Sequence, residues 1–218
     1  MSNPVNRLRD VVAVAERARL QRRGTVLEWF TVTWNLLEAA VALTAGVVAG
    51  SVALIGFGID SGIEVVAASA LLWRFRTAGA HATEKEHGVA ERRALYIVSA
   101  TFFALASYIA FEAVTALVSK EEPDTSAVGV VLAFASLVVM PTLAYAKQKT
   151  GRALGSRALE ADAMETWVCA YLSLALLVGL GLNVAFGWWW ADPVGALAML
   201  PVILWQGWET LEGARDED

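Results

Sequence analysis

Residues 51–73 read SVALIGFGIDSGIEVVAASALLW, an apolar run that contains two acids, Asp60 and Glu64. A run of about 20 mostly apolar residues is long enough for a helix to cross a bilayer. A charge at that depth costs about 3 kcal/mol or more, so acids in such helices are usually functional. Because residues four apart share one helix face, both carboxylates point the same way. The run therefore predicts a transmembrane helix with a cation pathway along one face.

The composition of the whole chain also indicates a membrane protein. Of its 218 residues, 57% are hydrophobic, and the mean hydropathy is +0.52. The single cysteine, Cys169, cannot form an intrachain disulfide, so its thiol is either packing or a metal ligand. The first twenty residues lack the apolar core of a signal peptide.

Hydropathy predicts an all-α membrane protein with six transmembrane helices. The expected spans are 25–49, 51–74, 94–118, 126–146, 160–185 and 192–211. Lys and Arg are concentrated before the first span and in the second and fourth connections, the latter being the basic segment 147–157. By the positive-inside rule, this distribution places both termini in the cytoplasm, and we expect a multi-pass protein of the cell (inner) membrane.

Three regions are expected along the chain. Residues 1–24 form a cytoplasmic segment, in which 8–23 (LRDVVAVAERARLQRR) reads as a basic amphipathic helix on the inner membrane surface. Residues 25–211 form the membrane domain, and 212–218 form a cytoplasmic tail. The partner of the basic helix is therefore expected to be the lipid bilayer and not a nucleic acid.

A second pair of donors lies in the fifth expected span, where Glu165 and Cys169 are four residues apart and Asp162 precedes them by about one turn. At 1.5 Å per residue, Glu64 lies about 15 Å, and Glu165 about 12 Å, from the cytoplasmic ends of their spans. The two spans run in opposite directions, so Glu64 can meet Glu165 while Asp60 meets Cys169. Four donors at one level suit a tetrahedral site for a late divalent transition metal. The alternative is structural: protonated Asp60 and Glu64 that only hydrogen-bond to neighbouring groups.

Other polar residues leave two interpretations open. Asn35 and Glu38 in the first span either line the ion path or hold helices together by hydrogen bonds. The connection that contains His81 and His87 either captures metal at the inner mouth or is a solvated charged loop. Glu112 is expected to be a structural or vestibule group.

Four motifs occur in a specific order: Gly50-Ser51-Val52-Ala53-Leu54 leading into Asp60-Ser61-Gly62-Ile63-Glu64, His87-Gly88-Val89-Ala90-Glu91, Ala161-Asp162 followed by Glu165-x-x-x-Cys169, and Trp190-Ala191-Asp192-Pro193. With these motifs the chain resembles the cation diffusion facilitator family of metal-ion/proton antiporters. The resemblance covers most of residues 25–211. It implies a homodimeric six-span transporter that exports divalent metal against an inward flow of protons.

Two departures from the family pattern affect this expectation. Glu165 and Cys169 stand where the family has His and Asp. The resemblance favours zinc as the transported ion, while this donor set leaves cadmium, iron, cobalt and manganese as alternatives. The family's cytoplasmic C-terminal domain is expected to be absent, so a homodimer would form through the membrane helices.

Two other classes of function remain to be weighed. A membrane metal sensor or structural subunit would use the same polar residues without transport. An intramembrane hydrolase is disfavoured because no expected span contains a histidine and neither His-Glu-x-x-His nor Gly-x-Ser-x-Gly occurs. We therefore expect a transporter without enzymatic activity or a prosthetic group.

Overall fold

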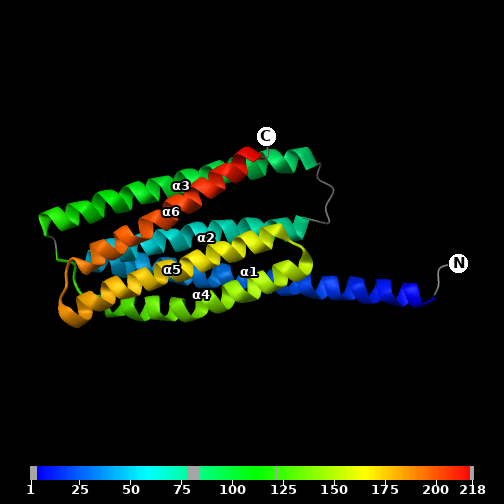
Figure 1. Ribbon diagram of the computed structural model, residues 1–218, viewed down its shortest axis with the longest axis horizontal. Helices are drawn as coiled ribbons and strands as arrows, with labels where there is room; N and C mark the ends of the chain where they lie inside the picture. Colours follow the sequence, from blue (N-terminus) through cyan, green and yellow to red (C-terminus); the bar gives the residue numbers. More distant parts are fainter. Residues whose placement is uncertain (1–3, 78–83, 121, 217–218) are drawn as a thin grey trace.

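The computed structural model describes residues 4–77, 84–120 and 122–216, and within them it contains helices and no strand (Figure 1). The helices are α1 (Pro4–Ala49), α2 (Val52–Thr77), α3 (Glu84–Ser119), α4 (Ala127–Leu154), α5 (Arg157–Phe186) and α6 (Ala191–Asp216). All six are long and apolar enough to cross a membrane. The prediction of an all-α protein with six spans is confirmed.

The basic N-terminal segment is helical, as predicted, but it is not a separate helix. It forms the first part of α1, which continues without a break to Ala49. We expected residues 8–23 to lie on the membrane surface. The start of α1 projects from the bundle along the direction of the first span (Figure 1), and its position on the membrane surface stays a prediction. Nothing in the sequence between the two parts, such as a proline, interrupts the helix.

The connection between α4 and α5 is shorter than predicted. We expected a basic loop from residue 147, but α4 continues to Leu154. Lys, Gln and Arg are good helix formers, so their charge did not end the helix. Gly155 ends it with a left-handed φ of 65°, and the Ser156 side chain then caps α5 by accepting a hydrogen bond from Leu159 N.

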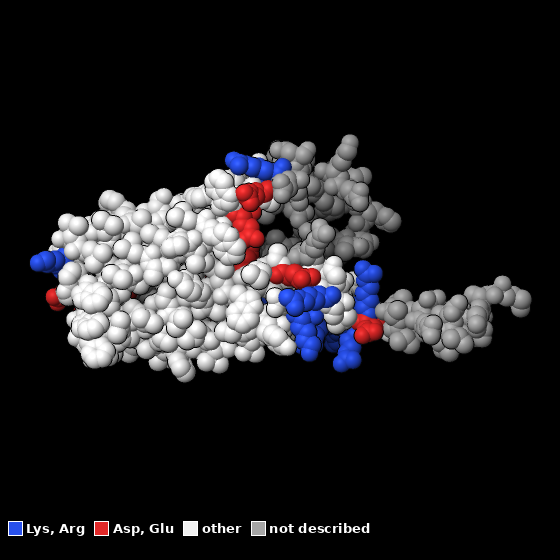
Figure 2. All heavy atoms as spheres, in the orientation of Figure 1, with Lys and Arg blue, Asp and Glu red and all other residues white. Residues whose placement is uncertain are grey.

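The helices pack mainly as three pairs, α1 with α2, α4 with α5, and α3 with α6. α2 contacts α1, α3, α5 and α6 and is the most buried of the six spans. Much of the outer surface is apolar, and on the face shown in Figure 2 a long uncharged region separates the charged ends. Lipid can cover such an apolar surface. The acidic side chains of α2 are buried inside the bundle, away from that surface.

The N-terminus of α2 is capped by a carboxylate from another helix. Asp192, in the first turn of α6, is fully buried. It accepts a 2.6 Å hydrogen bond from Ser51 Oγ and a 3.1 Å hydrogen bond from the backbone N–H of Val52. Free N–H groups at a helix start need such acceptors, and the helix dipole favours a negative charge there. Asp192 therefore joins α6 to α2, which positions the acids of α2.

We expect Asp192→Ala to lower the free energy of unfolding by about 1–3 kcal/mol, the usual cost of leaving buried hydrogen-bonding groups without a partner. The measurement is thermal unfolding of the purified protein in detergent. Asp124→Ala is the control, because Asp124 is an exposed acid before α4. If both variants unfold at the same temperature, Asp192 does not stabilise the bundle.

Candidate metal site in the membrane-spanning bundle

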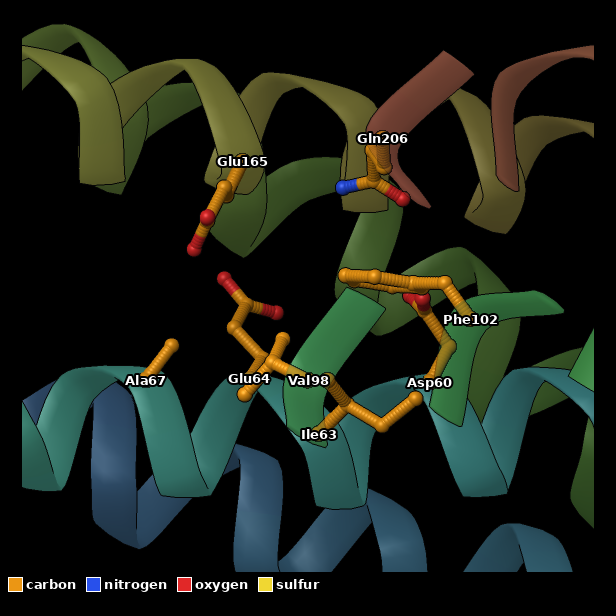
Figure 3. Close-up of a pocket in the computed structure, with 8 residues that line it drawn as sticks. All are labelled: Asp60, Ile63, Glu64, Ala67, Val98, Phe102, Glu165 and Gln206. Atoms are coloured by element: carbon orange, nitrogen blue, oxygen red, sulfur yellow. The ribbon is translucent and has the colours of Figure 1, made fainter. Parts of the chain in front are cut away.

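A small cavity lies beside the acidic face of α2 (Figure 3). It is lined by Asp60, Ile63, Glu64, Ala67, Val98, Phe102, Glu165 and Gln206. The cavity volume of about 10 Å³ is close to the space that one water molecule needs. α2, α3, α5 and α6 all contribute side chains. Three carboxylate side chains therefore line a small space that can hold a water molecule.

Of the two contacts expected from depth, Glu64 with Glu165 and Asp60 with Cys169, the first is seen at the cavity, whereas Cys169 is a neighbour of Glu64. In Figure 3 the carboxylates of Glu64 and Glu165 point toward each other, and Asp60 lies about one turn further along α2. Asp60 and Glu64 are buried, and Glu165 is partly buried. Sequence positions a hundred residues apart are thus brought to one level by the packing of α2 against α5.

Cys169 occupies a different place from the three acids. Its side chain is buried and is a polar neighbour of Glu64, but it does not line the cavity. No three His, Cys, Asp or Glu side chains in the described part of the chain form a group ready to hold a metal ion. The ligand set Asp60, Glu64, Glu165 and Cys169 therefore stays a prediction, and it requires side chains to rotate when an ion binds.

Two polar residues of α1 are fully buried without hydrogen bonds. Neither the side-chain polar atoms of Asn35 nor the carboxylate oxygens of Glu38 form a hydrogen bond of normal geometry, although Trp34 and Ser61 are polar neighbours of Glu38. Glu38 lies close enough to Asp60 and Glu64 for electrostatic interaction. A buried polar group without a partner costs about 1–3 kcal/mol, so a bound ion or water would be stabilised at this position.

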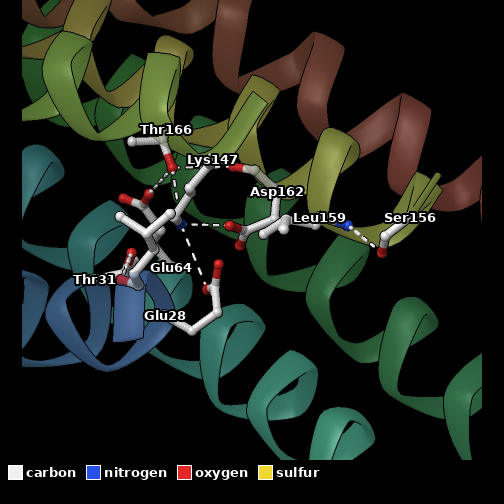
Figure 4. A network of polar contacts seen from close by, with 9 residues as sticks. Glu28, Thr31, Glu64, Lys147, Ser156, Leu159, Asp162 and Thr166 are labelled. Carbon is white, nitrogen blue, oxygen red and sulfur yellow. Dashed lines mark hydrogen bonds and ion pairs between the residues drawn. The ribbon is translucent and has the colours of Figure 1, made fainter. Parts of the chain in front are cut away.

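Figure 4 shows a buried lysine, Lys147, which the sequence analysis had assigned to a cytoplasmic loop. Lys147 lies in α4 and is fully buried. Its ammonium forms ion pairs with Asp162 and, at 3.5 Å, with Glu28. It also donates a 3.2 Å hydrogen bond to Thr166 Oγ1. Asp162, which we had considered as a metal ligand, is instead paired with Lys147 in this structure.

Thr166 connects this ion pair to the cavity. Its hydroxyl lies 3.2 Å from Glu64 Oε1 and 3.0 Å from the carbonyl oxygen of Asp162, and it can donate to either (Figure 4). A chain of polar contacts therefore runs from Lys147 through Thr166 to a cavity-lining acid. The sequence did hold a signal: Leu143, Lys147 and Thr150 follow a helical period on the buried face of α4.

Gln206 is a second residue that the sequence analysis passed over. It projects from α6 into the cavity, is only 8% exposed, and its Oε1 has no hydrogen-bond partner. An amide within an apolar span is the available signal for it. The histidines cannot be judged in the same way: His81 lies outside the described residues, and His87 lies in α3 with a side chain that is outside the described part.

Apolar helices arranged around buried carboxylates define a multi-pass membrane protein with a polar interior, the class that includes ion transporters. The chain belongs to the cation efflux family. The family model for the cation efflux transmembrane domain matches residues 29–216, which is most of the chain. The resemblance to metal-ion transporters that the sequence motifs indicated is thereby confirmed.

Similar proteins include an uncharacterized transporter of Synechocystis sp., 30% identical over 87% of this chain and 61% of that protein. Transmembrane protein 163 of Xenopus laevis is 24% identical over 75% of this chain and 57% of its own length. A protein named cation-efflux pump FieF of Shewanella oneidensis is 26% identical over 77% of this chain and 57% of its own length. The chain thus spans about three fifths of the length of these relatives.

Proposed function

We propose that this protein exports a divalent transition-metal ion in exchange for protons, through a site between α2 and α5. The observation that carries the proposal is the cavity that Asp60, Glu64 and Glu165 line, with the carboxylates of Glu64 and Glu165 pointing toward each other. Uncompensated carboxylates are costly inside a membrane protein, and a divalent cation offsets that cost directly. Membership in the cation efflux family supports the same direction of transport.

The proposed ligands are Asp60, Glu64, Glu165 and Cys169. Glu64 is the central member, because Glu165 faces it across the cavity and Cys169 is its neighbour. Asn35, Glu38 and Gln206 are buried and have side-chain atoms without partners, so they can donate oxygen ligands or bind the ion's water. His87 is proposed to act on the inner side of the site, where an ion would enter, and Asp162 is proposed to act there only through its ion pair with Lys147.

Proton exchange follows from the chemistry of the donors. A metal binds deprotonated carboxylates and thiolate, and protons compete for the same lone pairs. If the site opens alternately to the two sides of the membrane, metal release on one side is coupled to proton uptake there. The same residues then carry both ions without a separate proton path.

The proposed setting is the inner cell membrane with both termini in the cytoplasm. An even number of spans puts the termini on one side. On the face shown in Figure 2, the Lys and Arg side chains are concentrated at the end from which α1 projects, which by the positive-inside rule is the cytoplasmic end. We further propose a homodimer that forms through the lipid-facing helices.

Zinc is the favoured ion, with cadmium, iron, cobalt and manganese as alternatives, and Cys169 is the residue that distinguishes them. A thiolate favours softer ions over manganese. We expect Cys169→Asp to shift the transport preference from cadmium toward manganese by about tenfold or more, since second-shell changes alone alter metal affinity by about 10–100-fold. Competition between the two ions in transport measures this shift. Cys169→Ser tests whether loss of sulfur is sufficient, and an unchanged ratio in both variants would assign Cys169 to packing.

A metal sensor or structural subunit is the second candidate, because among the described residues no three His, Cys, Asp or Glu side chains form a group that could hold a metal ion. Reconstitution in proteoliposomes separates the two functions. A transporter moves Zn²⁺ across the sealed membrane at a rate that saturates with concentration. A protein that binds Zn²⁺ but gives no flux above empty liposomes is a sensor or subunit.

A further inference from the structure

Lys147 is the one buried basic side chain among the residues whose burial the structure describes. It is fully enclosed in α4, and its ammonium contacts carboxylates from two other helices, Glu28 of α1 and Asp162 of α5 (Figure 4). Taking a lysine ammonium out of water is strongly unfavourable unless such partners surround it. The neighbouring Lys149 is exposed, so the helix does not enclose its basic residues in general.

The position of this network relates it to the metal site. Glu28 lies ten residues before Glu38 on α1, which is about 15 Å along a helix. The network therefore lies between the cavity and the end of the bundle from which α1 projects, the proposed side of metal entry. Two carboxylates from different helices, inside the bundle and near the proposed path, are the kind of pair that a divalent ion would bind.

We propose that the Lys147 ammonium is a tethered cation that fills the Glu28–Asp162 pair and so prevents a transported metal ion from binding there. The metal is then confined to the site at Asp60 and Glu64. Through Thr166, which contacts both Lys147 and Glu64, the same network holds a metal-site acid in place. The inference rests on the proposed function, because it assumes that metal ions enter the bundle.

The test counts bound ions in variants that lack the main site. On an Asp60→Asn background, the zinc content per chain is measured after equilibrium dialysis, with and without Lys147→Met. We expect the Lys147→Met protein to bind one additional Zn²⁺, because the pair is vacated. Lys149→Met on the same background is the matched control and should add none. Adding Glu28→Gln and Asp162→Asn to the Lys147→Met protein should remove the additional ion.

Equal zinc content with and without the Lys147→Met substitution in folded protein would overturn the proposal, as would an additional ion that persists without the two carboxylates. If the Lys147→Met protein is not folded without metal, purification is compared with and without Zn²⁺. A divalent ion that replaces the ammonium should restore folded protein, and failure to do so also overturns the proposal. Absence of zinc flux in the wild-type protein would refute the proposed transport. The difference in zinc content between proteins with and without Lys147→Met could still be measured, so the two proposals fail separately.

Discussion

Asp60→Asn is expected to reduce metal flux in proteoliposomes by more than about tenfold, because loss of a direct ligand should cost at least as much as loss of a second-shell group. Asp60 is buried and lines the cavity formed by α2, α3, α5 and α6. The substitution keeps the size of the side chain and removes its charge, so the bundle should fold as before. Flux and thermal unfolding are measured on the same preparation, which separates loss of transport from loss of structure.

Glu112→Gln is the control for this experiment. Glu112 is an acid of α3 that does not line the cavity. Its neutralisation should leave the flux within about twofold of wild type, as expected of a residue outside the site. An equal loss of transport in the two variants would mean that general membrane electrostatics, and not a discrete site, controls transport.

Dissipating the pH gradient is expected to stop uphill accumulation of Zn²⁺ and leave only equilibration. In sealed vesicles with an internal pH dye, metal movement in one direction should be accompanied by proton movement in the other. Lowering the pH on the loading side should also raise the Zn²⁺ concentration needed for half-maximal flux, because protons compete with metal for the same carboxylates.

Glu165→Gln provides the matched variant for the proton experiment. Glu165 faces Glu64 across the cavity, so the substitution removes one carboxylate for which protons and metal compete. The dependence of flux on loading pH should become weaker, and the affinity for metal should fall. Metal movement without opposing proton movement in the wild-type protein would identify a channel or uniporter instead of an antiporter.

The sequence by itself determined the six helices, because apolar runs of sufficient length are a local property of the chain. It also placed Asp60, Glu64 and Glu165 at similar depths, since the rise per residue of a helix is fixed. The helix ends were less predictable. α4 passes through a basic segment that was predicted to be a loop, because charge alone does not end a helix and the left-handed turn at Gly155 does.

The tertiary structure alone decided which polar side chains meet. Lys147 reads as one of several basic residues at a membrane surface, yet packing of α4 against α1 and α5 encloses it between Glu28 and Asp162. Gln206 becomes a cavity residue only because α6 packs beside α2. Such contacts join residues far apart in the chain, and no local pattern encodes the partner. The buried ammonium of Lys147 is stable because two other helices supply carboxylates, so its role is settled by the assembled bundle.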